Sequence, residues 1–347
     1  MSPSLVFAYP GDLMTKTGGY AYDRHIVSEL RSAGWTVNMM PLGLGFPYPR
    51  ERDLRNAESL IAALPDETVL LVDGLAYGVL HEVAERERER LRILALVHHP
   101  LALETGLDPA DRVRLEVSER LALTCTRHVF VTSPATAKTL ESSYGLTSSH
   151  ITVVLPGTEP VQPAQRGSDV PHIVSVGSLT PRKGHDVLLR ALDTVRDLPW
   201  RATIVGSEKL EPATARTLRA LVKELDLEDR VVLAGEIDDV GEVFASADLF
   251  ALASRYEGYG MVFAEALAHG LPVIACRAGA VPDVVPAGAG RLVPPDDPAA
   301  FGTALREVLQ DNDLADQMAK AAYAAGRQLP TWAQSASVLS DRLKDFA

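Results

Sequence analysis

The chain has 347 residues, of which 46% are hydrophobic and 23% are charged, a composition that suits a soluble globular protein with room for two domains. Its formal net charge of −12 argues against nucleic acid as the main partner, because a phosphate backbone requires a basic surface. No apolar run approaches the roughly 20 residues of a membrane span, and the N-terminus lacks the features of a secretory signal. We therefore expect a cytoplasmic protein whose contact with a membrane is at most peripheral, at its inner face.

Apolar strands alternate with amphipathic helices along the first half of the sequence. This alternation predicts a parallel β-sheet with helices on both faces. The expected strands are residues 4–8, 35–40, 68–72, 92–97, 128–132 and 151–154. The expected helices are residues 19–33, 51–64, 75–90, 109–126 and 135–144.

Four prolines and two glycines interrupt the pattern in residues 156–171, which predicts a linker. A second series of strands follows it, at residues 172–176, 201–205, 230–234, 248–252, 272–275 and 290–293. The fold class is therefore α/β, with two doubly wound Rossmann-like domains facing a central cleft. We place the domains at residues 1–160 and 171–328, the linker at 161–170, and a terminal helix at 329–347, beyond a break at Leu329 and Pro330.

Glycines and histidines follow two strands of the first half. Gly18 and Gly19 precede a helix and would let the backbone approach a phosphate or a sugar, although two glycines also suit a plain tight turn. His98 and His99 come directly after a strand, at the sheet edge where ligands of such folds bind. A histidine without a metal partner is otherwise more often a structural hydrogen-bonding residue.

A loop with two adjacent cations opens the second half. In VSVGSLTPRKGHDVLLRAL, Arg182 and Lys183 stand between a strand and a helix N-terminus. Fixed cations and free helix amides both stabilise a diphosphate. The alternative is a pair of solvated surface cations.

Two glutamates flank a glycine-rich turn in residues 250–275, which read FALASRYEGYGMVFAEALAHGLPVIA. Glu265 lies in an otherwise apolar helix, where an ionised carboxylate is costly unless a polar cavity or a ligand hydroxyl meets it. Glu257 lies in the turn, beside amides of the residues Gly258, Tyr259, Gly260 and Met261 that can face a ligand. Eight residues of helix span about 12 Å, too far for the pair of carboxylates of a glycosidase. The alternative assigns Glu257 to helix capping and Glu265 to a solvated surface.

Several other kinds of site find no support in the sequence. No G-x-G-x-x-G follows a strand, and no G-x-x-x-x-G-K-[ST] occurs. Cys125 and Cys276 are too few and too far apart for a disulfide framework or a zinc site. The only D-x-D triplet, residues 311–313, lies between two expected helices and suits helix capping. We expect no metal site and no cofactor, with Arg182 and Lys183 in place of a divalent ion.

The segment EGYGMVFAE resembles the signature of family 4 glycosyltransferases, which have the two-domain GT-B architecture and act on nucleotide-sugars. The resemblance implies that Glu257 and the amides after it hold the transferred sugar, that Glu265 holds the ribose, and that Arg182 and Lys183 neutralise the departing diphosphate. It extends to Gly18 and Gly19, and to the loop glycines Gly206 and Gly235, expected to line the nucleotide pocket.

The same resemblance implies a histidine that touches the donor sugar. We assign this role to His98, with His99 as the alternative and Glu104 as a candidate for contact with the acceptor. It also implies that the terminal helix crosses back to the first domain, where Trp332 would be its anchor.

The sequence therefore predicts a retaining, metal-independent glycosyltransferase that moves a sugar from a nucleotide-sugar, with UDP preferred over GDP, to an acceptor of undefined class: saccharide, lipid or small molecule. The catalytic residues would be His98, Arg182, Lys183 and Glu257. A GT-B epimerase or phosphorylase and a non-catalytic nucleotide-sugar-binding module remain as alternatives. A periplasmic-type binding protein is disfavoured because no export signal is present.

Overall fold

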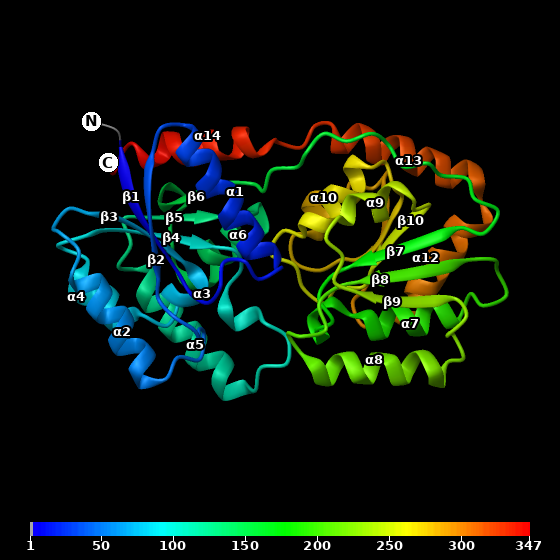
Figure 1. Cartoon of the computed structure of the whole chain (residues 1–347), viewed down its shortest axis with the longest axis horizontal. Helices are drawn as coiled ribbons and strands as arrows, with labels where there is room; N and C mark the ends of the chain where they lie inside the picture. Colours follow the sequence, from blue (N-terminus) through cyan, green and yellow to red (C-terminus); the bar gives the residue numbers. More distant parts are fainter. Residues whose placement is uncertain (1–2) are drawn as a thin grey trace. The chain divides into compact units, whose positions relative to one another are not determined.

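The computed structural model describes residues 3–347, and its contacts divide the chain into two compact units (Figure 1). The first unit comprises Met1–Gly157 and Pro330–Ala347, and the second comprises Thr158–Leu329. Each unit contains one six-stranded sheet in which every strand pairing is parallel. The predicted α/β class with two doubly wound sheets is confirmed.

The first sheet has the strand order β2-β1-β3-β4-β5-β6. Its central strands are buried on both faces because helices cover both sides, which explains the nearly continuous apolar sequence of Val69–Asp73. The strands are β1 (Ser4–Tyr9), β2 (Thr36–Pro41), β3 (Val69–Asp73), β4 (Arg92–Val97), β5 (His128–Val131) and β6 (Ile151–Val153). All six lie within one residue of their predicted positions.

The helices of the first unit begin after the strands and at the expected places, with one exception. The predicted helix 75–90 is two helices, because the chain leaves the helical path at Leu80, whose φ of −107° and ψ of 28° lie outside the helical range. Gly78 still has helical backbone angles, with a φ of −60° and a ψ of −13°. The helices are α1 (Gly18–Ser32), α2 (Glu51–Ala62), α3 (Gly74–Tyr77), α4 (His81–Glu87), α5 (Pro109–Leu123), α6 (Pro134–Tyr144) and α14 (Trp332–Leu343), with 3₁₀ turns η1 (Leu101–Leu103) and η2 (Ser148–His150).

The second sheet has the strand order β12-β11-β10-β7-β8-β9. Its strands are β7 (His172–Val176), β8 (Arg201–Val205), β9 (Val231–Gly235), β10 (Leu249–Leu252), β11 (Val273–Cys276) and β12 (Gly290–Val293). The helices are α7 (His185–Asp193), α8 (Pro212–Glu224), α9 (Val240–Ala245), α10 (Met261–Ala268), α11 (Val281–Val284), α12 (Pro298–Gln310) and α13 (Asn312–Gly326), with the 3₁₀ turn η3 (Pro181–Lys183). The D-x-D triplet has the predicted capping role, since the Asp311 carboxylate accepts from the backbone N–H of Leu314 at 2.9 Å.

The segment that the sequence marks as a linker is hydrogen-bonded to the second unit. The Asp248 carboxylate accepts from the backbone N–H groups of Gly167 at 2.6 Å and of His172 at 2.8 Å. The backbone N–H of Ala164 donates to the carbonyl of His269 at 2.8 Å. These bonds fix the start of β7 and hold the segment along the unit.

The C-terminal residues pack within the first unit after a break between Gly326 and Trp332. The indole of Trp332 stacks on the imidazole of His25 in α1, with ring centroids 4.3 Å apart. Just beyond the end of α1, the Trp35 indole donates to Ser340 Oγ of α14 at 2.9 Å. None of the helices in residues 3–347 combines the length and apolar character needed to cross a bilayer.

Candidate functional site

Glu257 is the centre of a charged cluster at the carboxyl end of the second sheet. It lies in the turn between β10 and α10, and only 4% of the residue is exposed. Its Oε1 atom lies 2.6 Å from Lys183 Nζ and accepts from Ser254 Oγ at 2.7 Å. Its Oε2 atom lies 3.4 Å from Arg182 Nη1. The structure thus joins three residues that the sequence suggested from two separate segments.

The electrostatics of the cluster keep Glu257 ionised. Burial by itself opposes ionisation, but the charges of Lys183 and Arg182 outweigh it, and the pKa of the carboxyl lies below its ordinary value. The Lys183 and Arg182 side chains retain 14% and 21% exposure, so both cations still reach solvent. One buried carboxylate and two cations leave a net charge of +1, which suits an incoming anion.

A close backbone approach brings the two cations to the glutamate. Gly184, which follows Lys183, has a φ of +64°, and a Cβ atom there would lie 1.9 Å from the carbonyl oxygen of Ala253. Only glycine can occupy this position. The backbone N–H of Arg255 also donates to the carbonyl of Arg182 at 2.8 Å, which fixes the loop beside the turn.

Arg255 and Asp296, which the sequence analysis did not single out, support this turn. The Arg255 guanidinium bonds both oxygens of the Asp186 carboxylate, at 3.0 and 2.8 Å, and reaches Asp296 at 2.6 Å. The carbonyl of Glu257 accepts from the backbone N–H of Ala280 at 2.9 Å.

Glu265 lies on α10 among buried apolar neighbours, as the sequence predicts. Phe263, Ala264, Ala266 and Leu267 are all buried, while Glu265 itself is partly exposed. Within residues 3–347 its carboxylate accepts no hydrogen bond from another side chain. Burial raises the pKa of this carboxyl to about 7. A half-buried acid of this kind can bind hydroxyl donors of a ligand, because they would replace the water it has lost.

The amides expected to face a ligand lie at the start of α10. Gly260, with a φ of +90°, precedes the helix, and Met261 is its first residue. Gly258 and Tyr259 complete the turn, and burial raises the pKa of the Tyr259 phenol to about 12. The first N–H groups of an α-helix have no partner within the helix, so this end can accept an anion or a hydroxyl.

Gly206 and Gly235, the two predicted loop glycines, are required for different structural reasons. A Cβ atom at Gly206 would lie 1.9 Å from the carbonyl of Gly177, because two loops of the second unit touch through their backbones. Gly235 has a φ of +69° and would present its Cβ to open space. Packing therefore accounts for Gly206, and backbone conformation accounts for Gly235.

In the first unit the structure brings Gly19 against His98. A Cβ atom at Gly19 would lie 3.3 Å from His98 Cδ2, whereas one at Gly18 would meet nothing within 4 Å. Both glycines begin α1, whose N-cap is Thr17. His99 lies apart from this contact, with its Nε2 atom 3.4 Å from Glu104 Oε2.

Two buried aspartates surround His98. Its Nε2 atom lies 3.1 Å from Asp23 Oδ1 and 3.7 Å from Asp73 Oδ2. Asp23 is fully buried and Asp73 is 2% exposed. The sequence analysis did not find either residue, although both leave a signal: Asp73 ends an apolar strand, and Asp23 interrupts the apolar stripe of α1.

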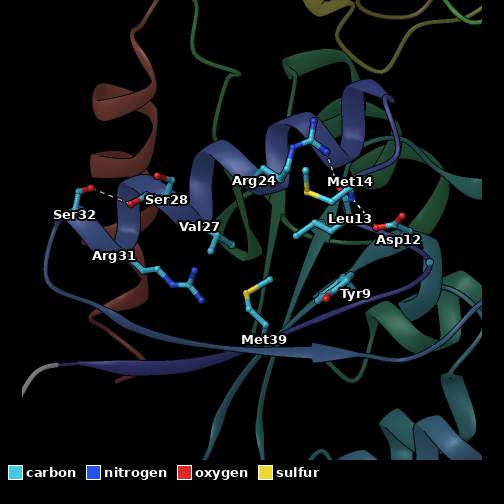
Figure 2. Close-up of a pocket in the computed structure, with 11 residues that line it drawn as sticks. Tyr9, Asp12, Leu13, Met14, Arg24, Val27, Ser28, Arg31, Ser32 and Met39 are labelled. Atoms are coloured by element: carbon cyan, nitrogen blue, oxygen red, sulfur yellow. Dashed lines mark hydrogen bonds between the residues drawn. The ribbon is translucent and has the colours of Figure 1, made fainter. Parts of the chain in front are cut away.

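A separate groove of about 840 Å³ lies beside α1 and contains none of the predicted site residues (Figure 2). Arg24 donates to the carbonyls of Leu13 and Thr15, and Arg31 donates to the carbonyl of Val37. Both apolar and polar side chains line the groove: Tyr9, Gly11, Asp12, Leu13, Met14, Arg24, Val27, Ser28, Arg31, Ser32 and Met39.

Comparison with known proteins shows what the second unit is similar to. Residues 159–325 match the family described as glycosyl transferases group 1. This segment makes up just under half of the chain. The match contains the cation loop, Glu257, Glu265, Gly206 and Gly235. Gly18, Gly19 and His98 lie outside it.

Curated relatives match this chain over part of their length. A D-inositol 3-phosphate glycosyltransferase of Corynebacterium kroppenstedtii is 32% identical over 275 residues, which cover 73% of this chain and 60% of the relative. A mannosylfructose-phosphate synthase of Agrobacterium fabrum is 28% identical over 225 residues, 59% of this chain and 50% of the relative. The chain thus spans between half and three-fifths of these two relatives.

Solved structures share the fold of this chain over nearly its whole length. Sucrose-phosphate synthase from Thermosynechococcus elongatus has a TM-score of 0.83 at 22% identity, covering 98% of both chains. Anabaena HepE in complex with UDP and glucose has a TM-score of 0.78 at 17% identity, covering 97% of this chain and 99% of that one. These similarities confirm the predicted GT-B fold class.

Proposed function

We propose that the protein is a retaining glycosyltransferase that transfers a sugar from a nucleotide-sugar, with UDP preferred over GDP, to an acceptor without a metal ion. The observation that supports the proposal most is the buried cluster of Glu257, Lys183 and Arg182 within the segment that matches group 1 glycosyltransferases. It offers fixed cations and a fixed carboxylate side by side, which is what transfer from a sugar diphosphate requires.

The cluster is arranged for the charge that develops as the bond to the diphosphate breaks. Lys183 and Arg182 would stabilise the negative charge that accumulates on the departing diphosphate, the role that a divalent ion plays in other enzymes. Because both cations are already held by Glu257, little side-chain entropy is lost when the diphosphate binds. Glu257 and the amides at the start of α10 would face the sugar, whose reacting carbon becomes oxocarbenium-like.

Glu265 would bind the ribose hydroxyls of the nucleotide. Its carboxylate is half-buried and accepts no side-chain hydrogen bond in residues 3–347. Two adjacent hydroxyls are a good match for one carboxylate, since each can donate to one oxygen. The preference for UDP is supported by the structural similarity to HepE, which is described in complex with UDP and glucose.

The relatives suggest which acceptors to test first. The names of the two sequence relatives include D-inositol 3-phosphate and mannosylfructose-phosphate. We propose a hydroxylated small molecule, with or without a phosphate group, as the acceptor. His98, Gly18 and Gly19 of the first unit are the residues that we propose for contact with the substrates on that side.

Transfer of labelled sugar tests the function directly. The purified protein is incubated with UDP-glucose, other UDP-sugars or GDP-mannose and a panel of inositol phosphates and sugar phosphates, in the presence of EDTA. Labelled product with the donor's anomeric configuration, measured by NMR, would support every part of the proposal. Conversion of the donor into an epimeric nucleotide-sugar would favour an epimerase, phosphate-dependent formation of a sugar phosphate would favour a phosphorylase, and binding without turnover would favour a non-catalytic module.

Matched variants distinguish a loss of turnover caused by the site from a general effect of substitution on the protein. Arg182→Ala and Lys183→Ala are each expected to lower turnover by about 100-fold or more, because each removes a charge that acts on the leaving group. Lys209→Ala removes an exposed lysine of the same unit, whose side chain is 85% exposed, and should leave turnover unchanged. Equal rates in all three variants would contradict the site.

A further inference from the structure

Asp23 and Asp73, which surround His98 in the first unit, have no role in the function proposed so far. Asp23 comes from the buried face of α1, Asp73 ends β3, and His98 follows β4. The His98 Nε2 atom lies 3.1 Å from Asp23 Oδ1 and 3.7 Å from Asp73 Oδ2. Two of the three side chains are almost completely buried.

Structural needs explain only one of the two carboxylates. Asp73 caps α3, because its Oδ1 atom accepts from the backbone N–H of Leu75 at 2.7 Å. Asp23 hydrogen-bonds His98 and interacts with Asp73, and burial raises the pKa of its carboxyl to about 7. Its buried Oδ2 atom is among the side-chain atoms of residues 3–347 that lack a hydrogen-bond partner. A buried carboxylate with an unsatisfied oxygen costs stability, and an apolar residue of similar volume would often be as good or better for folding. Folding alone therefore does not explain Asp23, whereas positioning of the His98 imidazole would.

We propose that Asp23 and Asp73 are positioning residues that hold the imidazole of His98 by its Nε2 atom, so that its Nδ1–H group is presented as a hydrogen-bond donor to a hydroxyl or phosphate oxygen of the sugar substrate. This inference rests on the proposed glycosyl transfer for the identity of the substrate. The arrangement of the three side chains is independent of that function.

Contacts around the ring fix its orientation. Gly19 lies against the Cδ2 side, where a Cβ atom would be 3.3 Å from Cδ2 and 3.6 Å from Nε2. Tyr22 of α1 meets the ring edge to face, with centroids 5.3 Å apart. The backbone is held as well, because Thr132 Oγ1 donates to the carbonyl of His98 at 3.1 Å. In the described part of the chain, His98 Nδ1 has no hydrogen-bond partner. It is not one of the fully buried atoms that lack a partner, so it remains accessible to a ligand.

The same contacts decide the protonation state of His98. Burial by itself lowers the pKa of the imidazole, but the charges and hydrogen bonds of Asp23 and Asp73 outweigh burial and raise it to about 10. The other titratable groups nearby, Tyr20 and Tyr22 of α1, have raised pKa values and stay neutral at pH 7. His98 is therefore an imidazolium at neutral pH, and its Nδ1–H bond to a substrate oxygen is charge-assisted.

Nuclear magnetic resonance of the imidazole tests the anchoring without any need for transfer. In the unmodified protein the ¹³C and ¹⁵N signals of His98, assigned with His98→Gln, are expected to show a protonated ring up to at least pH 8. Asp23→Asn keeps the shape and removes the charge, so the pKa of His98 should fall by roughly 2 units. Asp66→Asn removes an exposed carboxylate of the same unit and should not shift it. An unchanged His98 titration in Asp23→Asn would overturn the proposal.

Kinetics test the consequence for the substrate. Asp23→Asn is expected to lower kcat/KM at pH 8 by about 10-fold or more, with partial recovery at pH 6, where the imidazole is protonated again. Asp73→Asn keeps an oxygen that can cap α3 and should give a smaller change of the same kind. A shifted titration with an unchanged pH profile of turnover would reduce the aspartates to a structural role and overturn the proposal.

Two further outcomes are distinguishable. Because the three donor groups lie within 4.8 Å of one another, they could also hold a metal ion. Stoichiometric metal in the purified protein, with loss of the His98 shift on chelation, would overturn the proposal. The expected His98 titration in a protein that transfers no sugar would contradict the proposed function, while the anchoring of His98 would stand.

Discussion

Lys183 Nζ and Glu257 Oε1 lie 2.6 Å apart, and the two side chains are 14% and 5% exposed. Each residue lowers the cost of burying the other, since neither charge is well solvated. The pairing couples the loop that contains Lys183 to the turn that contains Glu257. A substitution of either residue should therefore change the stability of both segments.

Removal of Lys183 should destabilise the second unit. In Lys183→Met the buried Glu257 keeps only the more distant Arg182 and the hydroxyl of Ser254, so we expect a loss of about 2–3 kcal/mol in the free energy of unfolding. Urea denaturation at pH 7 measures it. In the double variant Lys183→Met, Glu257→Gln the loss should be smaller than the sum of the single losses, because the pair is removed together.

Lys209 and Glu236 provide a matched surface pair. Their charged atoms are 3.5 Å apart and the lysine is 85% exposed, so Lys209→Met should change the free energy of unfolding by less than about 0.5 kcal/mol. Equal losses for Lys183→Met and Lys209→Met would show that the buried pair has no special weight.

Glu265 should make the stability of the second unit depend on pH. Burial raises its pKa from 4.5 to about 7, so between these values the unfolded chain releases a proton that the folded chain keeps. Stability from this group is therefore complete below pH 4.5 and is lost as pH rises through 7. Glu265→Gln removes the loss, and we expect it to be more stable at pH 8 by roughly 1–3 kcal/mol and unchanged at pH 4.

The same substitution should weaken nucleotide binding. Glutamine accepts hydrogen bonds at one atom only, so it cannot bind two ribose hydroxyls as a carboxylate does. Calorimetry with UDP at pH 8 should give an affinity lower by about 10-fold or more for Glu265→Gln. A variant that is more stable and binds UDP as tightly as the unmodified protein would assign Glu265 to folding alone.

The strand pattern and the glutamate segment could be read from the sequence, while the ion pairs could not. Periodicity predicts strands and helices because burial is decided locally along the chain, but it predicts one helix over residues 75–90 where the structure has α3 and α4. The pairing of Lys183 with Glu257, and of Asp23 with His98, joins residues 74 and 75 positions apart. Such contacts depend on the order of strands in the sheet, which one sequence does not specify.

Gly19 should tolerate no methyl group beside His98. In Gly19→Ala the new Cβ would lie 3.3 Å from His98 Cδ2, so the ring must shift by a few tenths of an ångström against Asp23. We expect a changed chemical shift for the His98 imidazole and a drop in kcat/KM of about 10-fold, because small displacements of an oriented donor are costly. Gly18→Ala meets open space and should keep the free energy of unfolding the same or raise it. An unperturbed His98 signal in Gly19→Ala would show that the contact is loose.

The two loop glycines of the second unit should respond differently to alanine. Gly206→Ala places a Cβ 1.9 Å from a backbone carbonyl, so two loops must separate, and we expect a loss of more than about 2 kcal/mol in the free energy of unfolding. In Gly235→Ala the new Cβ meets no atom within 4 Å, so only the left-handed backbone conformation is unfavourable for alanine. We expect a loss of about 1 kcal/mol in the free energy of unfolding. The UDP affinity of Gly235→Ala tests whether Gly235 also contacts the nucleotide. A ligand that approaches the Gly235 backbone would be repelled by the added methyl group, so its affinity would fall. An unchanged UDP affinity in Gly235→Ala would remove this glycine from the nucleotide pocket and leave backbone conformation as its only role.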